Sequence, residues 1–217
     1  AAPQDGAPVG VGRRDAVAEG VRIVVAADGE RAARDRRSRF VHGADAQREP
    51  RHDDADVARA RGQYIALFSA DDVWLPHKVA SQVAVFDAEG PDLGVVFSEA
   101  RQMDEEGREL PERFIQQHRP GVTVPEGRIF ADLLPNNFIP ALTAMTRMEC
   151  FKAVGTYDES LVFEDWDMWL RLARHYRFHC LPEPAARYRV VSNSMVRTRS
   201  HAISVSAEVM FIKCLNR

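Results

Sequence analysis

The 217-residue chain has little cysteine and no surplus of basic charge. Its three cysteines, Cys150, Cys180 and Cys214, are far apart and form no CxxC pair, so the sequence indicates neither a disulfide framework nor a cysteine-based zinc site. Lysine and arginine number 29 against 32 aspartate and glutamate residues, a formal net charge of −3. Because nucleic-acid-binding chains usually carry a basic patch, we expect no nucleic-acid partner.

Long apolar runs and glycine-rich phosphate loops are also absent from the sequence. No apolar run approaches the length that spans a bilayer, and the first residues lack the charged start and apolar centre of a signal peptide. The sequence therefore predicts a protein of the cytoplasm without a transmembrane segment, and peripheral contact with the inner membrane face stays open. Neither GxxxxGK(S/T) nor GxGxxG occurs, so other groups would have to hold a phosphate-bearing ligand.

The apolar residues that are present, 45% of the chain, are enough for the core of one α/β domain. Three β-branched or aromatic runs predict buried strands: residues 21–29, 64–69 and 93–98. A helix is predicted between the last two, with Pro76 in its first position and Gly90 at its end. A strand, a helix and a strand in this order predict a βαβ unit and a parallel sheet.

The remainder of the chain has less regular patterns. Residues 1–20 are rich in glycine, alanine and proline and are predicted to form a loose leader. Scattered proline and glycine at 110–135 predict a long connection with one short helix at 129–134. The later segments are predicted as a strand, a helix and two short strands: residues 138–147, 164–176 and 177–191.

Acidic residues follow the predicted strands. Asp28 lies at the end of the first strand, and Asp71 and Asp72 follow the second, at the sheet edge where ligands of open α/β folds bind. Aspartate in such a place often caps a helix, but with Pro76 first in the helix the capping position is Leu75, and both aspartates come too early. Two adjacent carboxylates are suited to a divalent cation that in turn binds a diphosphate.

A second acidic pair, Glu164 and Asp165, lies at the start of the predicted amphipathic helix. Two interpretations have equal weight. Acidic residues in a first helical turn are stabilised by the helix dipole alone, by about 0.3–1 kcal/mol each. Alternatively, one of the two carboxylates projects into a cleft as a general base.

Two long segments resemble family 2 glycosyltransferases. The first, ARGQYIALFSADDVWLPHKVASQVAVF followed by LGVVFSEARQMDEEGREL, resembles the second half of their nucleotide-binding region. The second, NNFIPALTAMTRMECFKAVGTYDESLVFEDWDMWLRLARHYRFHCLPEPAARYRV, is similar to their acceptor region. The resemblance implies the GT-A fold, a Rossmann-related α/β fold whose mixed, mostly parallel sheet is flanked by helices. Residues 21–109 would form the nucleotide-sugar-binding half and residues 110–217 the acceptor-binding and catalytic half.

The same resemblance implies a reaction and a role for each acid. A sugar would pass from a UDP or dTDP donor to a glycan or glycolipid acceptor, with inversion at the anomeric carbon, in bacterial cell-surface polysaccharide assembly. Asp71 matches the acid of the DxD motif that binds Mn²⁺ or Mg²⁺, and Asp72 extends the motif. Asp28 matches the acid that contacts the nucleobase. Asp165 matches the catalytic base, with Glu164 beside it.

Three departures from the family pattern favour a second hypothesis. The family's opening strand is not recognisable before Val21, Ser69 stands in place of the first Asp of the DxD motif, and Val191 stands where a histidine is often found. These changes favour a catalytically inactive nucleotide-sugar-binding or scaffolding relative, whereas the retained acids of both motifs favour the enzyme. A third hypothesis, a phosphatase with an aspartyl nucleophile, needs an acid at position 69.

Overall fold

The computed structural model describes residues 23–27, 39–41, 57, 60, 62–68, 71–158, 160–161, 163–191, 207–210 and 212–213. Asp28, Ser69 and the predicted leader at 1–20 lie outside these residues. No helix within them has the length and apolar character that a bilayer crossing requires.

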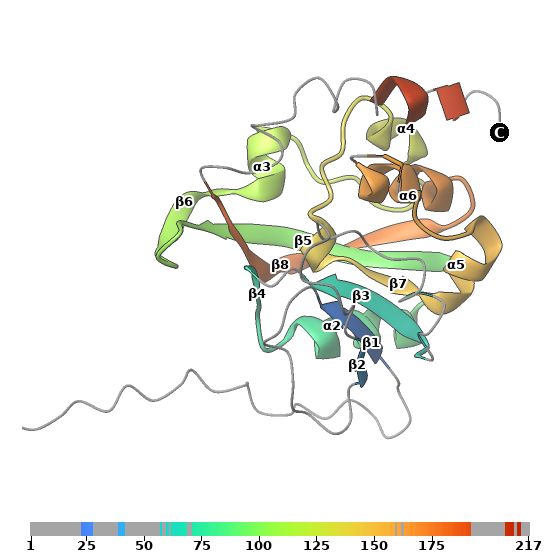
Figure 1. Ribbon diagram of the computed structural model, residues 1–217, viewed down its shortest axis with the longest axis horizontal. Coiled ribbons are helices and arrows are strands. Elements are labelled where there is room, and N and C mark those ends of the chain that lie inside the picture. Colours follow the sequence, from blue (N-terminus) through green and yellow to red (C-terminus); the bar gives the residue numbers. More distant parts are fainter. Residues whose placement is uncertain are drawn as a thin grey trace, which may run out of the picture.

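An eight-stranded mixed sheet forms the centre of this part of the chain (Figure 1), in the order β2-β1-β3-β7-β5-β8-β4, with β6 paired to β5. The strands are β1 (Ile23–Ala27), β2 (Arg39–Val41), β3 (Tyr64–Phe68), β4 (Val73–Trp74), β5 (Leu93–Met103), β6 (Glu109–Arg113), β7 (Met145–Arg147) and β8 (Arg177–Arg189). β1, β2, β3, β5 and β8 run in one direction, and β4, β6 and β7 run in the other. The predicted mixed, mostly parallel sheet is confirmed.

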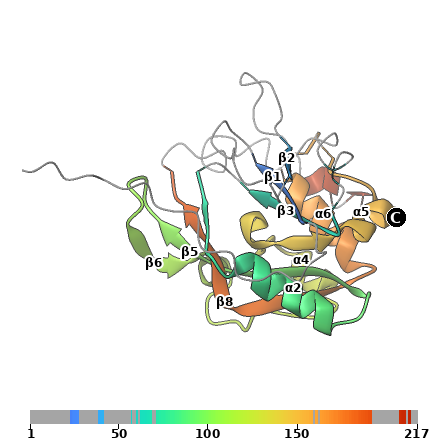
Figure 2. The same ribbon diagram turned by 90° about the horizontal axis from the view of Figure 1, so that it is seen from below.

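Helices cover both faces of the sheet (Figures 1 and 2). They are α2 (Lys78–Ala88), α3 (Phe114–His118), α4 (Phe130–Leu133), α5 (Met148–Val154) and α6 (Glu164–Ala173), with a 3₁₀ turn at Ala141–Thr143. On one face, α2 packs Val83 and Phe86 into a cluster with Tyr64. On the other face, α6 packs Trp169 against Phe178 of β8 at 6.4 Å between ring centroids. Each large apolar side chain buried this way stabilises the fold by about 1.5–3 kcal/mol.

The predicted strand-helix-strand unit corresponds to β3, α2 and β5. β3 and β5 run in the same direction, as predicted, but they are not neighbours. β7 lies between them, antiparallel to both, with Tyr64 opposite Arg147 and Val95 opposite Thr146. A distant short segment therefore completes the centre of the sheet.

The start of α2 differs from the prediction. The helix begins at Lys78 with His77 as N-cap, so Pro76 is not its first residue. The reason is a separate turn, closed by the Lys78 N–H donating to the Leu75 carbonyl at 3.0 Å. Proline is favoured at the second position of such a turn. Asp71 and Asp72 precede the helix by even more than predicted, so neither caps it.

Two predicted strand segments were also wrong in extent. Of residues 138–147, only Met145–Arg147 pair as a strand, because Pro140 cannot donate to a ladder and leads instead into the 3₁₀ turn. Residues 177–191, predicted as two strands, contain the single strand β8. Its register against β5 shifts where residues 182–185 bulge out opposite Glu99. In the 110–135 connection, the predicted helix is confirmed as α4, while β6 and α3 were not predicted.

Candidate active site

Asp71 and Asp72 lie in the turn that enters β4, and their side chains have different surroundings. The Asp71 side chain is exposed, whereas Asp72 is only 8% exposed. Asp72 Oδ1 accepts the backbone N–H of Arg189 at 2.9 Å, and Arg189 Nε donates to the Asp71 carbonyl at 2.8 Å. Arg189 Nη1 also donates to the carbonyls of Asp104 and Glu105. The end of β8 therefore fixes this turn.

The pKa of Asp72 is raised to about 7, mainly by burial and to a lesser degree by the charge of Asp71, while the hydrogen bond from the Arg189 backbone opposes the rise. A carboxyl group that is buried and bonded to a strand backbone is placed to hold the turn together. Asp71, in contrast, is exposed.

Behind the turn, Trp74 connects β4 to the rest of the fold. Trp74 pairs with Ala186 of β8, and its Nε1 donates to the Leu142 carbonyl at 2.9 Å. The ammonium of fully buried Lys78 lies 4.4 Å from the Trp74 ring centroid and donates to Gln82 at 2.7 Å. Burial lowers the pKa of Lys78 to about 7. These contacts give the acidic turn a rigid support.

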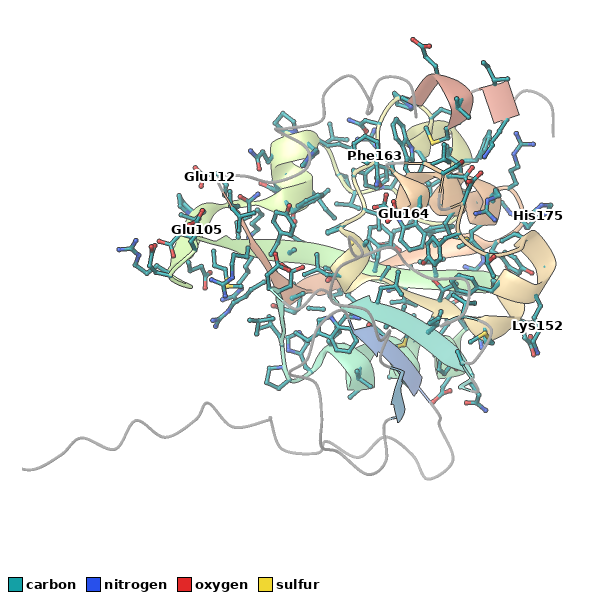
Figure 3. The ribbon with its side chains drawn as sticks, in the orientation of Figure 1. Glu105, Glu112, Lys152, Phe163, Glu164 and His175 are labelled. Atoms are coloured by element: carbon teal, nitrogen blue, oxygen red, sulfur yellow. The ribbon has the colours of Figure 1, made fainter. Side chains whose placement is uncertain are left out.

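Asp165 lies in the first turn of α6, next to Glu164, which Figure 3 labels beside Phe163 at the start of that helix. Asp165 Oδ1 accepts the Trp166 N–H at 2.7 Å, and Oδ2 accepts Nδ2 of Asn137 at 3.0 Å. Burial raises the pKa of Asp165 to about 6, while both hydrogen bonds oppose the rise. A buried carboxyl group with a raised pKa is a candidate general base.

The other residues of α6 attach the helix to its surroundings. Buried Asp167 accepts from Arg171 Nε at 2.8 Å, and the other two guanidinium nitrogens donate to the carbonyls of Val154 and Thr156. Trp166 Nε1 donates to the Leu133 carbonyl at 2.8 Å. The third acid of the EDWD sequence is therefore structural, and it keeps the first turn of α6 in place.

One connecting segment, residues 136–143, contacts Asp165 and the strand that follows the Asp71–Asp72 turn. Asn137 at its start donates to Asp165, and the Leu142 carbonyl near its end accepts from Trp74, which lies two residues after Asp72. Sequence reasoning did not identify Asn137 as a functional residue, because nothing local distinguishes it in NNFIP. Within the described residues no group of three or more His, Cys, Asp and Glu side chains could hold a metal ion.

Comparisons with known proteins agree with this architecture. Residues 55–155 match the model of glycosyl transferase family 2. An uncharacterized glycosyltransferase of Methanocaldococcus jannaschii is 31% identical over 137 residues, which cover 60% of this chain and 43% of that protein. One of Rickettsia conorii is 25% identical over 126 residues, covering 57% and 20%. The chain thus spans less than half the length of these curated relatives.

Two solved structures share the fold. Mannosyltransferase PcManGT from Pyrobaculum calidifontis, in complex with GDP-Man and Mn²⁺, has a TM-score of 0.56 at 12% identity and covers 91% of this chain and 65% of its own. S. aureus TarS 1–349, in complex with UDP-GlcNAc, has a TM-score of 0.54 at 16% identity and covers 75% and 46%.

These structures define the fold as that of the GT-A glycosyltransferases. Within that class, the sequence resemblance to family 2 agrees with the match of residues 55–155 to the glycosyl transferase family 2 model and with the M. jannaschii relative. The family match gives no support to the phosphatase hypothesis.

Proposed function

We propose that this protein is an inverting glycosyltransferase that moves a sugar from a nucleotide-diphosphate donor to a glycan or glycolipid acceptor. The observation that carries the proposal is Asp165, a carboxylate on the first turn of α6, whose pKa is raised to about 6 and whose two oxygens are both oriented by N–H donors. The family match supports the reaction class.

In the proposed reaction an Asp165 oxygen takes the proton of an acceptor hydroxyl. The acceptor oxygen forms a bond to the anomeric carbon as the bond from that carbon to the donor phosphate breaks. The electron pair of the broken bond leaves with the nucleoside diphosphate. Attack from the face opposite the leaving group inverts the anomeric centre, and Glu164 lies beside the base without this role.

Asp71 would hold a divalent cation, Mn²⁺ or Mg²⁺, together with the donor diphosphate. The residues present fit such an ion, because cations of this kind are often held by one or two carboxylates plus substrate phosphates and Asp71 offers an exposed carboxylate. When bound, the cation would offset the charge of the departing diphosphate. The relatives crystallised with UDP-GlcNAc, or with GDP-Man and Mn²⁺, support this choice of ligands. Asp28 is proposed to contact the nucleobase.

The alternative is a relative that binds a nucleotide sugar without turnover. Ser69 in place of the first Asp of the DxD motif, and Val191 in place of a histidine, favour this alternative. A role in bacterial cell-surface polysaccharide assembly, a place in the cytoplasm and peripheral contact with the inner membrane face remain predictions from the sequence.

Calorimetric titration with UDP, dTDP and GDP, each with and without Mn²⁺, tests the donor and metal assignment. We expect one nucleotide to bind in a metal-dependent way and Asp71→Ala to abolish that binding. Asp92→Asn is the matched control, because Asp92 is an exposed acid that accepts a hydrogen bond from Arg177 Nε at 2.6 Å. This variant should bind the nucleotide as the wild type does. Metal-dependent binding that survives in Asp71→Ala would refute the assignment of Asp71.

A further inference from the structure

The hydrogen bonds of Asn137 fix the orientation of its side-chain amide. Asn137 Oδ1 accepts the N–H of Ile139 at 3.1 Å, while Nδ2 donates to Asp165 Oδ2 at 3.0 Å. A flipped amide would place its oxygen against a carboxylate oxygen and lose the Ile139 bond. Because Oδ1 of Asn137 accepts the Ile139 N–H, its amide NH₂ group is the end that faces Asp165.

The segment that carries Asn137 is anchored on both sides. Phe138 and Ile139 are 0% and 1% exposed and belong to the core between the sheet and α6. A few residues earlier, the Leu133 carbonyl accepts from Trp166 Nε1 at 2.8 Å. Two links thus join this segment to the first turn of α6, one through Trp166 and one through Asp165 itself. Only the second touches the carboxylate.

Among the described residues, Asn137 is the side chain whose hydrogen bond lowers the pKa of Asp165, and the other hydrogen bonds that lower it come from backbone groups. Tyr157 is buried nearby, and its pKa is raised by burial and by the charges of Asp165 and Glu164. Glu164 is acidic and adjacent on the same helix. Arg171, a cation on the same helix, donates to Asp167, Val154 and Thr156.

We propose that Asn137 is a positioning residue for Asp165: its amide fixes the direction of the carboxylate and stabilises it as an anion, so that the base is ionised and aimed before an acceptor arrives. The inference rests on the proposed function, because orientation matters to transfer only if Asp165 is the base. Each carboxylate oxygen has one N–H partner and keeps a lone pair, so one of these lone pairs is left to accept the proton of the acceptor hydroxyl.

The decisive experiment measures the Asp165 pKa by ¹³C NMR of the full chain, with aspartate labelled at Cγ and the signal assigned by its absence in Asp165→Asn. The wild type should titrate near 6, the value that burial gives the group. Asn137→Ala should raise the midpoint by about one to two pH units, the effect of losing one hydrogen bond to a charged group. Asn137→Asp keeps the shape and the Ile139 bond but faces Asp165 with a second carboxyl group, so it should raise the midpoint further.

Two control variants separate this role from general loosening of the segment. Trp166→Phe removes the parallel link to Leu133 without removing a donor to the carboxylate, and Asn136→Ala changes the neighbouring amide. Both should leave the Asp165 midpoint within about 0.3 units of the wild type, well under the shift expected for a lost donor. An unchanged midpoint in Asn137→Ala, or an equal shift in Trp166→Phe, would overturn the proposal.

Once a donor is identified, the pH dependence of kcat gives a second test. In Asn137→Ala, the acidic limb of the kcat–pH profile should move to higher pH by the same amount as the NMR midpoint. The KM for the donor should be unchanged. These results are separable from the proposed function. If the midpoint shifts in Asn137→Ala but Asp165→Asn retains full transfer, the hydrogen bond is supported and Asp165 is not the base. If Asp165→Asn loses transfer but the midpoint does not shift in Asn137→Ala, Asp165 is the base and Asn137 does not position it.

Discussion

The turn that enters β4 and the first turn of α6 each present two adjacent acids, with different partners. Asp72 is held by a backbone N–H of β8, and its neighbour Asp71 is exposed. Asp165 is held by a side-chain amide and by its own helix. Burial raises the pKa of both Asp72 and Asp165. A raised pKa is therefore common to both acids and does not by itself assign a role to either. The two carboxyl groups differ in their hydrogen-bond partners.

The largest expected effect is the loss of transfer in Asp165→Asn, because the variant should lose the chemical step and keep nucleotide binding. Asp165→Asn keeps the size of the side chain and one of its two hydrogen-bond acceptors but cannot take a proton, so transfer should fall by about 10²–10⁴-fold. The affinity for the nucleotide identified by calorimetric titration should stay unchanged, because Asp71 is intact. Turnover and calorimetric Kd, measured on the same preparation, check both statements. Full turnover in this variant would remove Asp165 from the mechanism.

Arg189→Ala should loosen the first region alone. The variant loses hydrogen bonds to the carbonyls of Asp71, Asp104 and Glu105, and we expect the free energy of unfolding to fall by about 1–3 kcal/mol and metal-dependent nucleotide binding to weaken. Urea denaturation measures the first effect. Arg108→Ala is the control, because its ion pairs with Asp104 and Glu106 are exposed and should contribute little to stability. Equal losses of stability in both variants would argue against a special role of the Arg189 hydrogen bonds in fixing the turn.

The pH dependence of stability distinguishes the buried acid of the first region from its exposed neighbour. The folded pKa of Asp72 is about 7 against an ordinary 3.8, so between these values the folded protein binds more protons than the unfolded chain. Stability should therefore fall as pH rises through this window. Asp72→Asn keeps the acceptor for Arg189 and removes the titration, so its stability should fall less steeply than that of the wild type. Denaturation series at pH 4.5 and 7 measure the difference, and identical slopes would contradict the raised pKa.

Glu164→Gln should have the smallest effect. Loss of a negative charge at the start of α6 should cost about 0.3–1 kcal/mol of stability through the helix dipole. Transfer should fall far less than the hundredfold or more expected when a general base is lost. Parallel assays of Glu164→Gln and Asp165→Asn compare the two adjacent acids directly. If Glu164→Gln loses more transfer activity than Asp165→Asn, Glu164 and not Asp165 is the general base.

The sequence predicted features with a local cause and missed those set by distant contacts. β3 and α2 follow from apolar patterns within a few residues, and so does the acidic turn between them. Asn137 was missed because its partner lies 28 residues away. The difference between Asp71 and Asp72 was missed because Arg189 is 117 residues from Asp72. The start of α2 was placed too early because a turn and a helix can use proline at the same position.

A structure of the protein soaked with its nucleotide sugar and Mn²⁺ tests the central claim most directly. We expect the ion on the Asp71 carboxylate and the diphosphate, and an Asp165 oxygen on the face of the anomeric carbon opposite the leaving phosphate, still bonded to Asn137. An ion bound elsewhere, or an Asp165 carboxylate directed away from the sugar, would contradict the account.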